Sequence, residues 1–309
     1  MKFQGLLLAA IILVSVFFTS SYVRLLIQER GNNPQFLVET AKSQETQAVN
    51  SSSAAAVLKT TSAGDNVTTT QNLQPKIYAQ VFLKRLLNTG VDLAEQKTEN
   101  RWPIASLTKL MTALIVTEKI DLNTEIKLSE HAIEAEGVSG DFRVGDTYKA
   151  SNLLKAMLTL SSNDAAEALA ETYGEQDFIT AMNQKAVELK MTETKFVDPT
   201  GISFLNQSTA NDLAKLVNYI YLNNPEIFKI TTQKIISITE TQSEKSRILN
   251  SINEFAGQAN FLGGKTGFID ESKGNLISLF QDSNGRGPIL IIVLGSEDRF
   301  GDTRLLLNN

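Results

Sequence analysis

The sequence contains no cysteine and only one histidine, His131. Without cysteine the chain has no thiol nucleophile, no disulfide and no thiolate metal site. A Ser-His-Asp triad would have to use His131, which lies in a polar helical stretch and is expected at the surface. A single histidine also excludes a histidine-rich metal site. Nucleophilic chemistry in this chain therefore points to a hydroxyl group with a base other than histidine.

Positive charge is not in excess either. The chain has 29 Lys and Arg residues against 34 Asp and Glu residues, a formal net charge of -5 at pH 7. We therefore expect no nucleic acid as a partner, because nucleic-acid-binding domains carry a basic surface. The 309 residues, 42% of them hydrophobic and 20% charged, suit one globular domain with appendages.

A long apolar run lies at the N-terminus, where residues 5–22 are uncharged and follow Lys2. As a helix this run would span about 27 Å, enough for a slightly thin bilayer. We interpret residues 1–4 as a cytoplasmic N-terminus and residues 5–23 as a transmembrane signal anchor. Thr19 and Ser21 could still form a small-residue cleavage site, so the sequence leaves open whether the segment is removed.

Residues 24–75 contain few large apolar side chains and are rich in Ser, Thr, Asn, Gln and Ala. Such a segment cannot bury enough apolar surface to fold, so we predict a disordered polar linker. As a flexible coil it would reach about 35–40 Å and could hold a folded domain away from a membrane.

The pattern of apolar residues changes at residue 76 and predicts a folded domain over 76–309. The predicted strands cover residues 77–83, 91–96, 234–239, 261–266, 275–281 and 288–294, and the predicted helices cover a segment beginning near Pro103 and residues 151–160, 164–173, 176–190, 209–222 and 299–307. This order implies an α/β (α+β) fold in which one antiparallel sheet is flanked by helices and carries an inserted helical subdomain.

Ser106 and Lys109 lie three residues apart on the helix predicted to begin near Pro103. Residues at this spacing share one face of a helix, with about 5–6 Å between their Cβ atoms, so an amine could take a hydroxyl proton. A chain of this length should contain about one Ser-x-x-Lys by chance. The pair gains weight because Ser161-Ser162-Asn163 and Lys265-Thr266-Gly267 follow it in order.

These motifs give the chain a family resemblance. They are residues 103–109 (PIASLTK), 161–166 (SSNDAA), 198–202 (DPTGI), 208–210 (STA) and 264–267 (GKTG). From about residue 77 to 307 the chain resembles the serine D-alanyl-D-alanine carboxypeptidases, the low-molecular-mass penicillin-binding proteins of peptidase family S11. The resemblance implies a β-lactamase/transpeptidase-like fold.

The resemblance also implies catalytic roles. Ser106 would attack the carbonyl of the D-Ala-D-Ala bond and form an acyl-enzyme, with Lys109 as its general base. Burial and the neighbouring cation Lys265 would favour the neutral form of Lys109. Ser161 and Asn163 would relay the proton to the departing amine and hold the substrate and Lys109 in place.

The strand that carries Lys265 would bind the substrate. Lys265 and Thr266 would hold the terminal carboxylate of the peptide, and Gly267 would let backbone approach it closely. The backbone N–H groups of Ser106 and Phe268 would form the oxyanion hole.

The expected substrate is therefore a peptidoglycan stem peptide ending in D-Ala-D-Ala, and β-lactam antibiotics would act as covalent inhibitors. No metal or organic cofactor is implied. Because peptidoglycan lies outside the cytoplasmic membrane, we expect a single-pass protein of the cell membrane, anchored by its N-terminal helix, with an extracytoplasmic catalytic domain.

Three alternatives to the carboxypeptidase stay open. A D,D-endopeptidase would cut peptidoglycan cross-links with the same residues. A serine β-lactamase usually carries a Glu-x-x-Leu-Asn run, which is not found between Asn163 and Lys265. A catalytically inactive wall-binding module would predict damage at Ser106, Lys109 or Lys265, and all three residues are present.

Overall fold

The structure is a computed structural model and describes residues 76–309. The cytoplasmic N-terminus, signal anchor and linker predicted over residues 1–75 lie outside the described residues. Among residues 76–309, no helix combines the length and the apolar character needed to cross a membrane.

A five-stranded antiparallel sheet forms the main layer of the fold, with the strand order β2-β1-β11-β10-β9. Its strands are β1 (Val81–Leu86), β2 (Val91–Gln96), β9 (Phe261–Ile269), β10 (Lys273–Gln281) and β11 (Pro288–Ser296). All nine residues of the central strand β11 are buried, as expected for an apolar strand covered on both faces. Strand β9 lies at one edge, so alternate backbone groups of this strand face away from the sheet.

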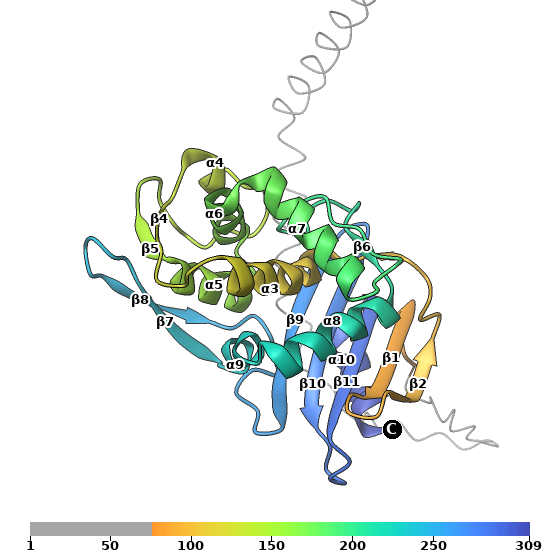
Figure 1. The fold of residues 1–309 in the computed structure, drawn as a ribbon. Coiled ribbons are helices and arrows are strands. Elements are labelled where there is room, and N and C mark those ends of the chain that lie inside the picture. The colour runs from red at the N-terminus through yellow and green to blue at the C-terminus, as the bar shows by residue number, and fades with distance from the viewer. Residues whose placement is uncertain (1–75) are drawn as a thin grey trace, which may run out of the picture. The chain divides into compact units, whose positions relative to one another are not determined.

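Helices cover both faces of the sheet (Figure 1). Helix α8 (Ala210–Asn223) packs on one face and helix α10 (Arg299–Asn308) on the other. Each begins at a capping residue, because Thr209 accepts a hydrogen bond from the N–H of Asp212 and Asp298 accepts one from the N–H of Gly301.

The helical subdomain lies beside the β9 edge (Figure 1). It contains η1 (Ala105–Thr108), α3 (Lys109–Lys119), α4 (Glu130–Ile133), α5 (Ala150–Thr159), α6 (Asn163–Tyr173) and α7 (Glu175–Glu188), with the short hairpin β4 (Glu125–Lys127) and β5 (Thr147–Lys149). Helix α9 (Glu226–Thr231) and the hairpin β7 (Ile235–Thr239) and β8 (Ser246–Asn250) lead from α8 to β9, and β3 (Trp102–Pro103) pairs with β6 (Gln207–Ser208). An antiparallel sheet flanked by helices, with an inserted helical subdomain, is the architecture predicted from the sequence.

Most predicted elements differ from the structure by one to three residues at an end, and two begin at clearly different positions. The first strand was predicted over 77–83 but runs over Val81–Leu86, because the N–H groups of Tyr78 and Ala79 donate to the carboxylate of Asp302 on α10 instead of joining the sheet. The helix predicted to begin near Pro103 starts as the 3-10 turn η1, and α3 begins at Lys109. Pro103 itself lies in strand β3.

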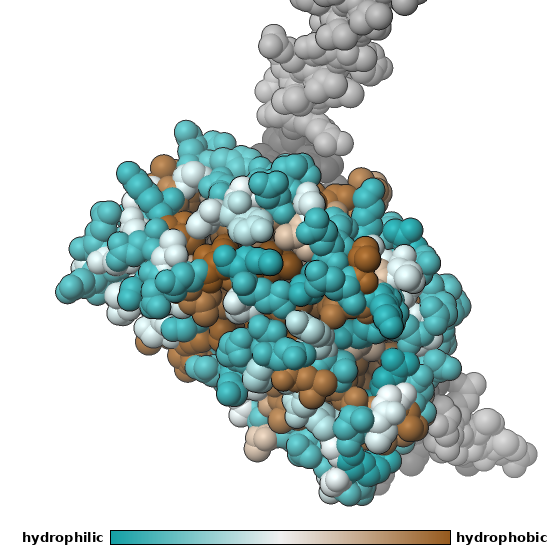
Figure 2. Space-filling model, in the orientation of Figure 1, coloured by the Kyte–Doolittle hydropathy of each residue, from teal (hydrophilic) through white to brown (hydrophobic). Residues whose placement is uncertain are grey.

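Strand β8 was not predicted. Its sequence, SRILN, contains only two apolar residues, and one of them, Ile248, is exposed. This segment is a strand because its backbone pairs with β7, and not because its own side chains are buried. Hydrophilic side chains dominate the face shown in Figure 2, with separate hydrophobic patches among them, as on the surface of most folded domains.

Candidate active site

Ser106 lies in the 3-10 turn η1, between the edge strand β9 and helix α3. Its side chain is half-buried, and the preceding residue, Ala105, has a φ of 49°, in the left-handed region that a residue with a Cβ rarely adopts. A Cβ added to Gly201 would lie 2.0 Å from the carbonyl oxygen of Ala105. Only glycine can therefore pack against this strained turn.

Lys109, the first residue of α3, is fully buried and directs its amine at Ser106. Its Nζ lies 3.1 Å from Ser106 Oγ, 2.5 Å from Asn163 Oδ1 and 2.6 Å from the carbonyl oxygen of Thr200. The last two groups are acceptors only. A neutral amine has two N–H groups for these acceptors, which leaves its lone pair for the Ser106 hydroxyl proton.

Burial lowers the pKa of Lys109 from 10.5 to about 7, against the opposing charges of Asp198, Glu167 and Asp164. Near neutral pH a large fraction of the amine is then unprotonated, as a general base requires. Burial is one of the two causes expected from the sequence. The other, the charge of Lys265, is not among the causes of the shift at Lys109; instead, the charge of Lys109 lowers the pKa of Lys265.

Ser161 lies in the turn between α5 and α6, and Asn163 is the first residue of α6. Ser161 contacts Lys265 and Asn163 contacts Lys109. Ser161 Oγ accepts a hydrogen bond of 2.9 Å from Lys265 Nζ. Asn163 accepts from Lys109 through Oδ1 and donates to the carbonyl of Glu136 through Nδ2. The helical subdomain therefore supplies one partner to each lysine.

The residues between and after this pair fix the turn. Ser162 Oγ caps α6 by accepting from the N–H of Ala165. The Asp164 carboxylate accepts from the N–H of Gly140 at 2.8 Å and from Ser139 Oγ. Ser161 has a φ of 66°, a strained backbone conformation that persists only where the surrounding structure holds it. The contacts of Ser162 and Asp164 hold the turn in this conformation.

Lys265, Thr266 and Gly267 lie on the edge strand β9, where their outward backbone groups face η1. Lys265 is 2% exposed, and burial, followed by the charges of Lys109 and Arg299, holds its pKa well below the usual value. A carboxylate arriving beside it would restore the charged form, since an opposite charge favours the ammonium.

Gly267 lies directly against the backbone of the nucleophile. A Cβ at this position would be 3.0 Å from the carbonyl oxygen of Ile104 and 3.1 Å from the nitrogen of Ser106. A larger residue would therefore crowd the N–H expected to contribute to an oxyanion hole. Phe268, which follows, exposes 58% of its surface.

Two further residues support the site. Asp198 lies in the motif 198–202 but was given no role from the sequence, and Arg299 was not singled out. Asp198 accepts from the N–H groups of Thr200 and Gly201 at 2.8 and 2.6 Å, which orients the Thr200 carbonyl toward Lys109. Arg299, at the start of α10, donates from Nη1 to the carbonyl of Gly267 at 2.8 Å. Asp198 could have been found from its place in the Asp-Pro-Thr-Gly run, whereas nothing near Arg299 in the sequence signals its position.

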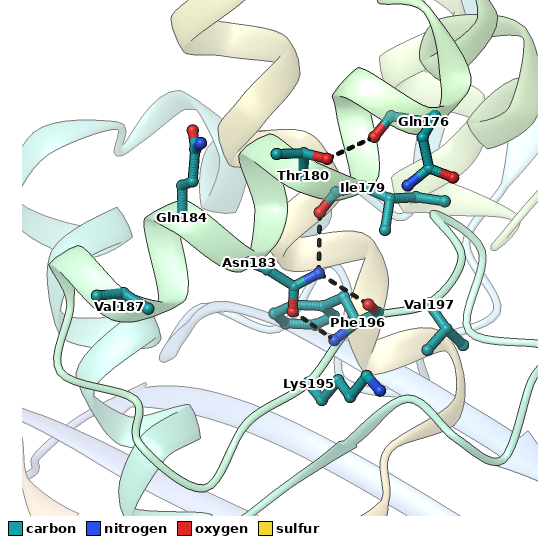
Figure 3. Close-up of a pocket in the computed structure, with 9 residues that line it drawn as sticks. All are labelled: Gln176, Ile179, Thr180, Asn183, Gln184, Val187, Lys195, Phe196 and Val197. Atoms are coloured by element: carbon teal, nitrogen blue, oxygen red, sulfur yellow. Dashed lines mark hydrogen bonds between the residues drawn. The ribbon is translucent and has the colours of Figure 1, made fainter.

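A separate hollow of about 550 Å³ lies between α7 and the segment 195–197 (Figure 3). Asn183 crosses it, donating to the carbonyl of Phe196 at 2.8 Å and accepting from the N–H of the same residue at 3.0 Å. Of the nine residues that line it, only Lys195 is ionisable. The hollow offers no nucleophile with a base, so the cluster of residues around Ser106 is the candidate active site.

Comparisons with known proteins agree with this geometry. A family model described as D-alanyl-D-alanine carboxypeptidase, peptidase S11, matches residues 66–298. A D-alanyl-D-alanine endopeptidase of Pseudomonas aeruginosa is 33% identical over 225 residues, 69% of this chain and 69% of its own. The D-alanyl-D-alanine carboxypeptidase DacF of Bacillus subtilis is 29% identical over 235 residues, 74% of this chain and 59% of its own.

A solved structure extends the comparison to the fold. Penicillin-binding protein D2 of Listeria monocytogenes, in its ampicillin-bound form, is 30% identical with a TM-score of 0.66, over 75% of this chain and 97% of that one. The penicillin-binding, transpeptidase-like fold predicted from the sequence is thereby confirmed. Because the family model covers most of the chain, including Ser106, Lys109 and Lys265, this chain belongs to peptidase family S11, the D-alanyl-D-alanine carboxypeptidases.

Proposed function

We propose that the chain is a serine-type D-Ala-D-Ala carboxypeptidase that trims peptidoglycan stem peptides through an acyl-enzyme on Ser106. The observation that carries this proposal is the position of Lys109 Nζ, 3.1 Å from Ser106 Oγ, in a site that lowers the pKa of the amine to about 7. A hydroxyl beside a largely neutral amine is an activated nucleophile without histidine.

In the acylation step Ser106 Oγ attacks the carbonyl carbon of the penultimate D-Ala and its proton passes to Lys109. The C–N bond then breaks, and the departing D-Ala amine takes a proton from Lys109 by way of the Ser161 hydroxyl, which Lys265 holds at 2.9 Å. Water next attacks the ester, the shortened peptide leaves as a carboxylic acid, and Ser106 regains its proton. The backbone N–H groups of Ser106 and Phe268 would hold the oxyanion in both steps.

The end of the site that carries Lys265 and Arg299 suits a substrate with a free C-terminal carboxylate. Lys265 and Thr266 lie on the strand facing Ser106, and Arg299 adds a second cation behind Gly267. A carboxylate bound there would receive charge-assisted hydrogen bonds, which are the stronger kind. This arrangement favours cleavage next to a chain end, which is the carboxypeptidase reaction.

Replacing Lys265 with alanine is expected to lower kcat/KM for a D-Ala-D-Ala peptide about 10- to 100-fold, mainly through KM, because a hydrogen bond to a charged group is lost. The comparison substrate is the same peptide with an amidated C-terminus, measured by release of the last residue. The preference of the wild type for the free carboxylate should disappear in Lys265→Ala and persist in Lys229→Ala, an exposed lysine on α9. An unchanged preference in Lys265→Ala would contradict the assigned role.

The D,D-endopeptidase reaction is the second candidate, because relatives with that printed name match over a similar share of the chain. The catalytic steps would be identical and only the leaving amine would differ. Purified full-length protein incubated with pentapeptide monomers and with cross-linked dimers separates the two reactions by mass spectrometry of the products. Release of free D-Ala from monomers should exceed conversion of dimers to monomers, and the reverse order would assign the endopeptidase.

We further propose that β-lactam antibiotics acylate Ser106.

We also propose that residues 5–23 anchor the protein in the cytoplasmic membrane, with residues 24–75 as a tether and the catalytic domain outside. The apolar run at residues 5–22 supports the anchor, and the location of peptidoglycan outside the membrane supports the orientation. In cells, the full chain should sediment with membranes and be digested by protease added outside. The mass of its N-terminal peptide will show whether residues 1–23 are retained, and a protein protected from external protease would overturn the orientation.

A further inference from the structure

Three side chains of types that commonly bind metal ions meet where the helices α4, α6 and α7 come together. They are His131 on α4, Glu167 on α6 and Glu175 in the first turn of α7. One ligand atom from each lies within 4.8 Å of the other two, and His131 Nε2 is 3.9 Å from Glu175 Oε2. The proposed catalytic steps use none of the three.

Glu167 is the inner member of this cluster and is incompletely satisfied. Its Oε2 atom has less than 1 Å² of exposed surface and no hydrogen-bond partner within residues 76–309. A buried carboxylate oxygen without a partner is costly unless a cation or a proton compensates it.

We propose that His131, Glu167 and Glu175 form a binding site for a divalent zinc-like cation at the junction of α4, α6 and α7. One imidazole nitrogen and two carboxylate oxygens suit Zn²⁺, whereas Mg²⁺ and Ca²⁺ prefer oxygen ligands alone. In a tetrahedral site with ligand bonds of about 2.0–2.1 Å, ligand atoms are separated by about 3.3 Å. His131 and Glu175 are exposed at 67% and 53%, so both side chains are free to close the remaining distance, and water would complete the coordination.

The position of the site links it to the loop of residues 134–146, which follows α4 directly. In this loop the carbonyl of Val138 accepts from the N–H of Asn163 at 2.7 Å, and the carbonyl of Glu136 accepts from its side chain. Glu167 lies one turn after Asn163 on α6. A cation joining α4 to α6 and α7 would therefore fix both the start of this loop and the helix that orients the partner of Lys109.

Zinc binding can be tested on the full chain without substrate, so the result does not depend on the reaction proposed above. Calorimetric titration of EDTA-treated protein with ZnCl₂ should show one site, and MgCl₂ should not compete for it. Because His131 is the only histidine, ¹⁵N-histidine labelling gives a single imidazole signal, and one equivalent of Zn²⁺ should shift its Nε2 resonance. Zinc should also raise Tm, since it binds only the folded site.

The variants His131→Ala, Glu167→Gln and Glu175→Gln should each weaken zinc affinity by at least roughly tenfold. The matched control is Glu226→Gln, an exposed glutamate in the first turn of α9, which should bind zinc like the wild type. Glu175→Gln is exposed and serves as the informative variant if Glu167→Gln folds poorly. An imidazole signal that zinc does not move, or equal affinity in Glu175→Gln and Glu226→Gln, would overturn the proposal.

Discussion

Ser106→Ala should form no covalent adduct with benzylpenicillin and should release no D-Ala from a pentapeptide, with kcat reduced on the order of 10⁶-fold. The reason is that the acyl-enzyme requires an oxygen at this position, and no other hydroxyl is bonded to Lys109 in the described residues. Intact-mass spectrometry of the full chain, followed by peptide mapping, measures the adduct directly.

The control for Ser106→Ala is Ser237→Ala, which removes an exposed hydroxyl from β7. This variant should be acylated like the wild type. The free energy of unfolding of both variants should lie within about 0.5 kcal/mol of the wild-type value, because neither change opens a cavity in the core. An adduct that maps to Ser161 in the Ser106→Ala protein would overturn the assignment of the nucleophile. An adduct that forms on Ser106 in the wild type and disappears within seconds would instead indicate a β-lactamase.

Lys109→Met should reduce the acylation rate by roughly 10²–10⁴-fold, the range that general-base catalysis supplies. In the wild type the rate should follow the neutral amine, so it should fall about tenfold per pH unit below 7 and level off above it. Stopped-flow acylation by a chromogenic cephalosporin across this range measures both effects. Lys119→Met, at the exposed end of the same helix, should keep the wild-type rate and pH profile.

The same substitution should change how stability depends on pH. The pKa of Lys109 is about 7 in the folded chain and 10.5 ordinarily, so between these values the unfolded chain binds more protons and the free energy of unfolding rises with pH. Lys109→Met should show a smaller rise, which leaves the part contributed by Lys265, while Lys119→Met should keep the wild-type slope. Denaturant unfolding at pH values between 7 and 10.5 gives the slopes, and equal slopes in Lys109→Met and the wild type would contradict a neutral buried amine.

Much of the fold was predictable because local patterns and global structure agree. The apolar strand Pro288–Ser296 is buried along its whole length, and the helix over residues 164–173 has a capping serine before it. The first strand was shifted because Asp302, more than two hundred residues away, takes the N–H groups of Tyr78 and Ala79. A contact at that distance leaves no trace in the local pattern.

The candidate site was predictable where chemistry sits in contiguous motifs and not elsewhere. The structure brings together Ser106, Lys109 and the motifs that contain Ser161 and Lys265, as the resemblance implied. The Thr200 carbonyl could not be predicted, since every residue has one and only the loop geometry aims it. Residues of the zinc-binding proposal were equally hidden. His131 was expected at the surface, and it is exposed, but its carboxylate neighbours come from two other helices.

The hydrogen bonds of Lys109 join three segments that are far apart in the sequence. The amine belongs to α3, the Thr200 carbonyl to the segment 197–206, and Asn163 to the start of α6. If α6 or the segment 197–206 moves away from α3, water enters and the amine becomes an ordinary, protonated lysine while the sheet remains intact. Heat or mild denaturant should therefore abolish activity before the sheet unfolds, so that activity reports whether these three segments stay packed together.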